Sequence, residues 1–374
     1  MVAARRRARG AEPAPAATLS ARLLAWYDEH RRQLPWRAAA GRPAEPYHVL
    51  LSEIMLQQTT AATVSRRFAA FLARFPDLAA LAAADEAEVL HAWQGLGYYR
   101  RARALHALAR VVTLRHGGRL PQDQAELRAL PGIGPYTASA LRAIAFGQAA
   151  VPVDGNVLRV MARLHRVETP LPAALPELRG RAEALAERER PGDLAQALMD
   201  LGATVCRPRK PRCGVCPWQA SCAGHGAGIA AELPRRTARA ARPVRRGLAF
   251  LLTRPDGAML FRRRPPEGLL GGLHELPSSP WQEGELALAA ALGHAPAAAD
   301  WRLHRAPVRH AFTHFLLELT LAEASTAADG GPRGLWCPAG ELDRLALPTI
   351  MRKLLRQAGA LGADGAPAGA ASVR

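Results

Sequence analysis

The chain has 374 residues, of which 49% are hydrophobic, and its formal net charge is +18. This length predicts two or three domains, and the apolar content excludes a wholly disordered chain. No apolar run is long enough to span a membrane, and no secretory signal precedes the first helix, so we expect a cytoplasmic protein. The positive charge comes almost entirely from arginine and favours a polyanionic partner such as nucleic acid. A ribosomal or architectural protein is the alternative, but it would have a smaller core and no catalytic residues.

Composition divides the chain into five parts. Residues 1–17 are rich in Arg, Ala and Pro without periodicity, and we expect a disordered basic tail. Residues 18–230 have helical periodicity and predict an all-α domain, and the arginine-rich stretch 231–246 predicts a linker. Residues 247–358 predict an α+β domain. The Ala- and Gly-rich stretch 359–374 predicts a flexible tail.

The expected elements follow from hydrophobic spacing. Helices are expected over 23–27, 49–75, 86–93, 99–112, 124–130, 137–146, 157–167 and 194–205. In the second domain, runs 248–253 and 258–261 flank Pro255-Asp256-Gly257 and predict a β-hairpin. Further strands are expected over 271–277, 310–321 and 334–337, and helices over 285–292 and 349–358.

A short turn carries two glycines within residues 124–146, in the sequence Leu-Pro-Gly-Ile-Gly-Pro-Tyr. Gly132 and Gly134 remove side-chain bulk and permit positive φ, and Pro135 suits the first turn of a helix. The free amides of such a turn, at the positive end of a helix, suit a phosphate of nucleic acid. A tight helix–helix turn that binds nothing is the alternative.

Two carboxylates are candidates for catalysis. Glu53 lies in the mostly apolar helical run LSEIMLQQT, where burial would raise its pKa toward that of a working acid. The alternative is a glutamate that faces solvent. Asp154 precedes Gly-Asn-Val and could act at the site or simply cap the next helix.

Four cysteines, Cys206, Cys213, Cys216 and Cys222, have the spacing C-x6-C-x2-C-x5-C. Such clustering indicates a metal site in a reducing compartment and not disulfides. Four thiolates can close a tetrahedral zinc site or hold a [4Fe–4S] cluster, and ligand chemistry alone slightly favours zinc. The basic stretch 207–212 between the first two cysteines suggests a structural centre that holds this loop against phosphate.

The cysteine spacing, the LPGIGPYTA hairpin and the VDGN segment resemble the helix–hairpin–helix DNA glycosylase superfamily with an iron–sulfur cluster. The runs LSEIMLQQT and GLGYYRRAR, together with the second domain, make the chain similar to MutY-type adenine DNA glycosylases. The resemblance covers residues 34–222 and continues more weakly beyond them. It implies a [4Fe–4S] cluster on the four cysteines.

The resemblance also implies roles for particular residues. Glu53 would protonate adenine at N7, and Asp154 would stabilise the positive charge that develops on the sugar. Tyr136 and Asn156 would position Asp154 and the sugar. Tyr136 stands where endonuclease III-type relatives have a Schiff-base lysine, and the two lysines, Lys210 and Lys353, lie far from it in the sequence, so we expect no strand-cleaving lyase activity.

Contacts to the lesion are implied at several positions. Gln58 and Tyr98 would fill the stack around 8-oxoguanine or the gap left by the flipped base, and Arg32 would lie near the adenine pocket. The C-terminal domain resembles the Nudix-like module of the family, but residues 286–293 lack the glutamates that a hydrolytic Nudix enzyme needs for Mg²⁺. Its remaining role would be recognition of 8-oxoguanine. The Phe312-Thr313-His314 segment matches the family's Phe-Ser-His loop, with threonine in place of serine.

The sequence therefore predicts a monofunctional, base-flipping adenine glycosylase of base excision repair, acting on double-stranded DNA with adenine opposite 8-oxoguanine or guanine. We expect a monomer in the bacterial cytoplasm, associated with the nucleoid, whose linker could bind other repair proteins. Two alternatives remain: a glycosylase of the same fold with another target base, and a non-catalytic iron–sulfur protein that binds DNA or senses redox state.

Overall fold

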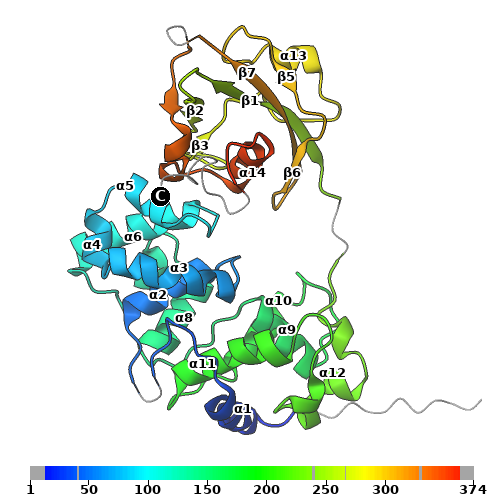
Figure 1. The fold of residues 1–374 in the computed structure, drawn as a ribbon. Coiled ribbons are helices and arrows are strands. Elements are labelled where there is room, and N and C mark those ends of the chain that lie inside the picture. Colours follow the sequence, from blue (N-terminus) through cyan, green and yellow to red (C-terminus); the bar gives the residue numbers. More distant parts are fainter. Residues whose placement is uncertain (1–12, 40–41, 238–240, 266, 328–330, 363–374) are drawn as a thin grey trace, which may run out of the picture. The chain divides into compact units, whose positions relative to one another are not determined.

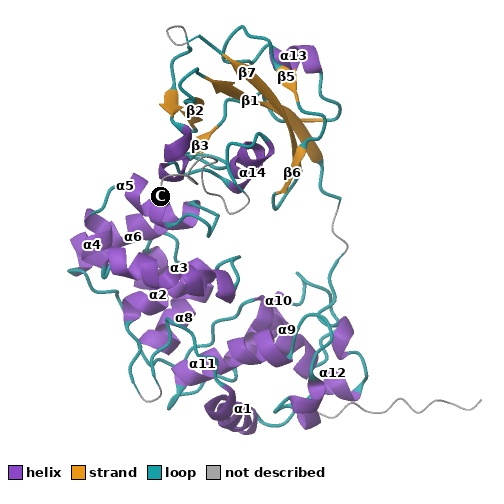
Figure 2. Ribbon diagram, viewed as in Figure 1, coloured by secondary structure: helices purple, strands orange, loops and turns teal. Residues whose placement is uncertain are grey.

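The computed structural model describes residues 13–39, 42–237, 241–265, 267–327 and 331–362. Two compact units are present, Met1–Ala83 with Ala104–Arg239 and Ala84–Arg103 with Ala240–Arg374. All named strands lie in the second unit, whereas the first is helical (Figures 1 and 2). The division differs from the sequence-based one in two places, because residues 84–103 group with the second unit and residues 231–237 with the first. None of the helices in the described ranges is long and apolar enough to cross a membrane.

The helices of the first unit follow the predicted periodicity with shorter pieces. They are α1 (Ala16–His30), α2 (Pro46–Leu56), α3 (Ala61–Arg74), α4 (Leu78–Ala83), most of α6 (Arg100–His116), α7 (Gln124–Ala129), α8 (Pro135–Ala140), α9 (Gly155–Leu164), α10 (Leu175–Glu183), α11 (Pro191–Asp200) and α12 (Ala223–Gly226). The predicted single helix over 49–75 is two helices, because the chain turns at 57–60 and the Thr60 side chain caps α3. Helix α1 begins at Ala16, inside the predicted basic tail, of which residues 1–12 lie outside the described ranges.

A core between α1, α9, α10 and α11 fixes the ends of these helices. Helix α9 places Val157, Val160, Met161 and Leu164 in this core at helical spacing, and all four are almost completely buried. The N-terminal end of α9 carries Asp154, and the segment after α11 leads to Cys206. The same packed helix pair therefore holds the candidate catalytic aspartate and the first cysteine.

Two helices end in π-helical segments. Helix α8 continues as η1 (Leu141–Ala145), and α11 continues as η2 (Leu201–Val205). The sequence predicted the extent of both runs but not their geometry. Such insertions widen one turn and are frequent at functional sites. Here η1 lines a cavity and η2 ends at Cys206.

The second unit also contains α5 (Glu86–Ala92), α13 (Leu288–Leu292), α14 (Thr349–Gln357) and a sheet. Its strands are β1 (Val244–Thr253), β2 (Met259–Arg263), β3 (His274–Glu275), β4 (Gln282–Glu283), β5 (Arg302–Leu303), β6 (Val308–Ala311), β7 (Leu316–Ser325) and β8 (Leu335–Cys337). The order is β3-β2-β1-β7-β5; β4 pairs with β1, β6 with β7 and β8 with β2. Strands β1 and β7 pair in parallel over their full lengths. The β1–β2 hairpin is confirmed, but the run over 310–321 is two antiparallel strands joined by a turn.

Apolar side chains cover both faces of the sheet in the second unit. Successive residues of β1 point to opposite faces, and since consecutive residues of β1 are apolar, both faces must be buried. Leu248 and Phe250 face a small cluster that includes Ala291 of α13. Ala249 and Leu251 face the larger cluster, which contains the apolar residues of α14. Leu361 is buried in that cluster, so the chain remains packed into the stretch predicted to be a flexible tail, while residues 363–374 lie outside the described ranges.

Candidate active site

Glu53 is a buried carboxylate in an apolar helix, as the sequence indicated. Helix α2 begins with Pro46 after a Glu45 cap, and the Glu53 side chain is only 4% exposed. The Tyr136 hydroxyl hydrogen-bonds to the Glu53 carboxylate, while Oε2 has no hydrogen-bond partner among the described residues. Burial raises the pKa of Glu53 to about 7; the Tyr136 hydrogen bond opposes this rise, the charge of Asp154 adds to it, and Arg37 opposes it. Glu53 is thus a carboxyl group that can carry a proton near neutral pH.

Asp154 caps α9 and also lies close enough to Glu53 for its charge to raise the pKa of Glu53. Its Oδ1 accepts the backbone N–H groups of Asn156 and Val157, each at 2.8 Å, and its Oδ2 accepts from Asn156 Nδ2 at 2.8 Å. These three hydrogen bonds fix the carboxylate in one orientation. The structure therefore confirms that Asp154 caps α9. It also places the Asp154 carboxylate close enough to Glu53 to raise the pKa of Glu53, which a helix cap need not do.

The glycine turn brings Tyr136 to this carboxylate pair. Gly132 has φ +79°, and a Cβ there would lie 2.8 Å from the Cβ of Ala104, so the close approach requires glycine. Gly134 precedes α8, whose first residue is Pro135, and Tyr136 follows in the first turn. Burial raises the pKa of Tyr136 well above its usual value, so the hydroxyl remains a donor. Phosphate binding by the turn stays a prediction.

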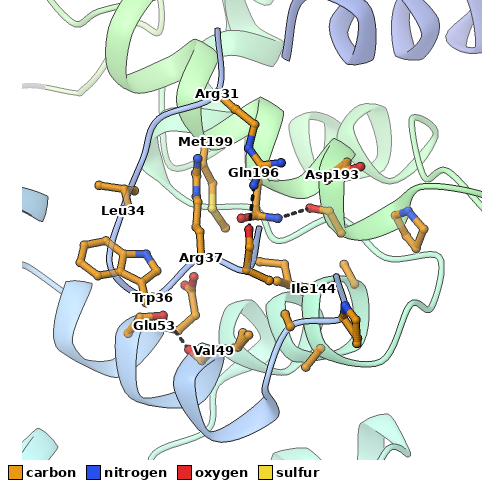
Figure 3. A pocket seen from close by; sticks show the side chains of 18 of the residues that line it. Arg31, Leu34, Trp36, Arg37, Val49, Glu53, Ile144, Asp193, Gln196 and Met199 are labelled. Atoms are coloured by element: carbon orange, nitrogen blue, oxygen red, sulfur yellow. Dashed lines mark hydrogen bonds between the residues drawn. The ribbon is translucent and has the colours of Figure 1, made fainter. Parts of the chain in front are cut away.

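A cavity of about 450 Å³ opens beside Glu53 (Figure 3). Its walls come from the segment between α1 and α2, from α2 itself, from η1 and from α11. Leu34, Trp36, Ile144 and Met199 give it apolar surfaces, and Glu53, Arg32, Arg37 and Gln196 supply polar groups. This combination of apolar side chains and hydrogen-bonding groups suits a ring system whose edge carries hydrogen-bonding atoms. Asp154 and Tyr136 do not line this cavity but lie next to Glu53.

Two arginines at the cavity are held by one buried aspartate. Asp200 is fully buried, and each of its oxygens accepts two hydrogen bonds. Arg37 donates through both terminal nitrogens at 2.7 and 2.8 Å, and Arg32 donates through Nε at 2.6 Å and its backbone N–H at 3.0 Å. Arg32 was predicted near a pocket from the resemblance, whereas Arg37 and Asp200 were not predicted. The criterion that found Glu53, a carboxylate inside an apolar helix, would also have found Asp200 in LAQALMD.

A second arginine network joins Asp154 to the cysteine loop, residues 206–222, which carries the four cysteines. Arg159 donates to Asn156 Oδ1 at 2.8 Å and to the carbonyls of Gly202 and Cys206 at 2.7 and 2.8 Å. Asn156 in turn donates to Asp154. Hydrogen bonds therefore connect the candidate catalytic aspartate, through Asn156 and Arg159, to the first cysteine of the loop.

The four cysteines surround one small cavity, as a shared cofactor requires. Four thiolates at one cavity supply the ligand set of a [4Fe–4S] cluster. Cys206, Cys213, Cys216 and Cys222 would hold the cluster, and the cluster would fix the loop that carries the basic residues 207–212.

The predicted lesion contacts occupy exposed positions. Gln58 and Tyr98 both have positive φ, 59° and 47°, which is uncommon for residues other than glycine and often marks a functional position. Tyr98 is 53% exposed, with the Arg101 guanidinium 5.5 Å from its ring centre. In the second unit, Thr313 and His314 form the exposed tip of the β6–β7 turn, which is closed by the Phe312 N–H donating to the Phe315 carbonyl.

We expect Gly202→Ala to displace Asn156, which holds the Asp154 carboxylate. An added Cβ would lie 2.7 Å from Asn156 Cβ, and helix packing leaves no space for it. The displacement of Asn156 should turn the Asp154 carboxylate and lower the catalytic rate about 10–100-fold, with a loss of stability of about 1–3 kcal/mol. The matched control is Gly180→Ala, where an added Cβ meets nothing within 4 Å. Equal rates for both variants would contradict the proposed coupling.

Comparison with known families agrees with this architecture. Residues 51–181 match the HhH-GPD superfamily of base excision DNA repair proteins, residues 206–222 match the iron–sulfur binding domain of endonuclease III, and residues 248–357 match the NUDIX domain. The solved structure of a thermostable thymine-DNA glycosylase is similar with a TM-score of 0.51 and 31% identity, covering 56% of this chain and 96% of that chain. Fold and site thus define a helix–hairpin–helix DNA glycosylase with an iron–sulfur domain and a Nudix-like domain.

Curated relatives specify the family. The adenine DNA glycosylase of Homo sapiens is 34% identical, covering 89% of this chain and 72% of its own length. That of Mycolicibacterium smegmatis is 44% identical, covering 62% of this chain and 78% of its own length. The chain belongs to the adenine DNA glycosylases. It is a DNA-binding enzyme of base excision repair that carries a [4Fe–4S] cluster, which decides the choice between zinc and iron–sulfur that ligand chemistry left open.

Proposed function

We propose that this enzyme removes adenine paired with 8-oxoguanine or guanine in double-stranded DNA, and that it does so without cutting the strand. The observation that carries the proposal is the unpartnered Oε2 of Glu53, buried at a cavity large enough for one flipped base. A base must leave the duplex to reach such a site. The substrate would be chromosomal DNA, and we therefore expect the enzyme at the nucleoid.

The proposed reaction uses the two carboxylates in different roles. Protonated Glu53 donates its proton to adenine N7, and the bond between C1′ and N9 breaks with its electron pair going to the departing base. The negative charge of Asp154 stabilises the oxocarbenium-like sugar. A water molecule then attacks C1′ and gives a proton to the Glu53 carboxylate, which restores the acid and leaves an abasic site.

The arrangement around the carboxylates supports this division of roles. Burial raises the pKa of Glu53 to about 7, and three N–H donors hold the Asp154 carboxylate in one orientation. In the proposed complex this carboxylate would lie near the reacting sugar. Tyr136 donates to Glu53, and Asn156 donates to Asp154. The apolar side chains of the cavity would pack against the purine, and Arg32, Arg37 and Gln196 would lie at its edges.

The absence of an amine at the site supports a monofunctional reaction. Within the described ranges, no lysine lines the cavity. Lys353 lies in the second unit and donates to the Arg309 carbonyl, and Lys210 is exposed in the cysteine loop. A Schiff base with the abasic sugar would need one of these amines, and so β-elimination of the strand is not expected.

The second unit would read the opposite base. We infer that α13 corresponds to the helix that carries the metal-binding glutamates of a hydrolytic Nudix enzyme, and its sequence, LAAAL, has no carboxylate. The exposed Thr313 and His314 offer a hydroxyl and an imidazole for hydrogen bonds to 8-oxoguanine. Recognition and not hydrolysis is therefore the proposed task.

The test uses four duplexes that hold adenine opposite 8-oxoguanine, guanine or thymine, and thymine opposite guanine. Each is incubated with the protein and analysed with and without hot alkali. We expect strand breaks only after alkali and only in the two adenine mispairs. Breaks without alkali would contradict the monofunctional reaction, and release of thymine would favour a glycosylase with another target. No release from any duplex by iron-loaded protein would leave only a DNA-binding role.

The double variant Thr313→Ala/His314→Ala should lower the preference for 8-oxoguanine over guanine. Each lost hydrogen bond contributes about 1 kcal/mol, so the ratio of excision rates, adenine opposite 8-oxoguanine over adenine opposite guanine, should fall about tenfold or more. The rate with guanine should change little, because guanine lacks the 8-oxo group. Single-turnover rates on the two duplexes measure this ratio. An unchanged ratio would remove these residues from lesion recognition.

A further inference from the structure

Arg163 is a buried arginine without a carboxylate partner. It lies on α9 one turn after Arg159, and its side chain is among the largest fully buried ones, with 2% exposure. Its Nε donates to the Leu233 carbonyl at 2.9 Å, and its two terminal nitrogens donate to the carbonyls of Arg207 and Pro208 at 2.7 and 3.1 Å. Terminal nitrogen Nη1 also donates to Cys206 Sγ at 3.3 Å.

The charge of Arg163 needs an anionic partner. A buried, unpaired guanidinium costs several kcal/mol, and carbonyl oxygens reduce this cost only in part. Among the described residues no Asp or Glu forms an ion pair with Arg163. The groups nearby that can carry negative charge are cysteine sulfurs, and Cys206 Sγ is the one that accepts a hydrogen bond from Arg163. An iron–sulfur cluster with four thiolates is net negative, because the thiolates outweigh the charge of the core.

We propose that Arg163 is the positioning residue for the cluster, acting as both counter-ion and hydrogen-bond donor to the Cys206 thiolate. Hydrogen bonds to the sulfurs and nearby charge are the main protein features that set a cluster's reduction potential. Arg163 favours the more negative, reduced form of the cluster over the oxidised one. It thereby raises the potential and slows loss of iron.

The same guanidinium connects three parts of the chain. It joins α9 to the start of the cysteine loop at Arg207 and Pro208, and to Leu233 beyond the last cysteine. Leu233 is 2% exposed, and the following residues remain docked on the first unit, where the Leu171 N–H donates to the Arg235 carbonyl at 2.9 Å. One side chain therefore holds the start of the cysteine loop and the segment that follows the loop, and it also contacts Cys206.

The test compares iron-loaded wild type with Arg163→Met and Arg163→Lys. Three quantities are measured: iron per chain, the reduction potential of the cluster in a dye-calibrated titration, and the rate at which the cluster absorbance is lost in the presence of an iron chelator. We expect Arg163→Met to have a more negative potential and to lose iron at least several-fold faster. Arg163→Lys keeps the positive charge but lacks the planar guanidinium and its several N–H donors. Its potential and its iron-loss rate should therefore lie between those of the wild type and Arg163→Met.

Arg212→Met is the matched control, because it removes an exposed positive charge from the same loop. Solvent screens that charge, so its potential should equal that of the wild type. If Arg163→Met cannot hold iron while Arg163→Lys can, the proposal is supported. It is overturned if Arg163→Met keeps the wild-type potential and iron-loss rate. It is also overturned if Arg212→Met shifts the potential as much, or if Arg163→Lys and Arg163→Met behave alike.

Discussion

Glu53→Gln is expected to reduce single-turnover excision of adenine about 10²–10⁴-fold, the usual contribution of a general acid. Glutamine has the same shape and can still accept from Tyr136, but it cannot deliver a proton to N7. Binding of the mispaired duplex, measured separately, should remain close to that of the wild type. A variant that excises within a factor of three of the wild type would exclude Glu53 as the acid.

The same substitution should stabilise the protein at high pH. The folded chain holds the Glu53 proton up to a pKa of about 7, whereas an unfolded chain loses it near 4.5. The folded state therefore loses stability between pH 4.5 and 7, by about 3 kcal/mol in total, and the cost stays constant above pH 7. Glu53→Gln lacks this cost, so its gain in Tm over the wild type should be larger at pH 8 than at pH 4.5. A gain that does not depend on pH would contradict the raised pKa.

Asp154→Asn is the second substitution with a large expected effect. Asparagine is as good a helix cap as aspartate, so α9 should keep its start and the protein its stability. The negative charge beside the developing oxocarbenium ion is lost, and excision should fall by about 10²–10⁴-fold. Thermal unfolding and single-turnover kinetics on the same preparation separate the two roles of this residue.

Asp154→Ala provides the comparison. It removes the cap as well as the charge, and should lower stability by about 1 kcal/mol while reducing excision as much as Asp154→Asn does. If Asp154→Asn keeps normal excision and only Asp154→Ala loses activity, then Asp154 would act through its cap and not through its charge.

The sequence predicted those features that depend on local pattern. Helical spacing placed α2 and α9, and an acid among apolar residues identified Glu53. The β1–β2 hairpin followed from Pro-Asp-Gly between two apolar runs. The sequence pattern did not predict the turn at residues 312–315, because the apolar residues before and after it continue one strand-like pattern. The family resemblance had nevertheless placed a loop at residues 312–314.

The rest depends on contacts between distant segments. Arg37 and Asp200 are 163 positions apart, and nothing in the sequence near either one indicates that they form a buried pair. The hydrogen bonds of Arg159 and Arg163 to the cysteine loop require the packing of α9 against the segment after α11. The π-helical turns of η1 and η2 likewise depend on how their neighbours pack, because the apolar spacing of their sequences fits an ordinary α-helix.

The pH dependence of single-turnover excision by the wild type tests the central claim most directly, using a duplex with adenine opposite 8-oxoguanine. If Glu53 acts as a buried acid with a pKa of about 7, the rate should be constant at mildly acidic pH and fall about tenfold per pH unit well above 7. The residual rate of Glu53→Gln should not show this fall. A wild-type rate that stays constant or rises from pH 6 to pH 9 would contradict the account.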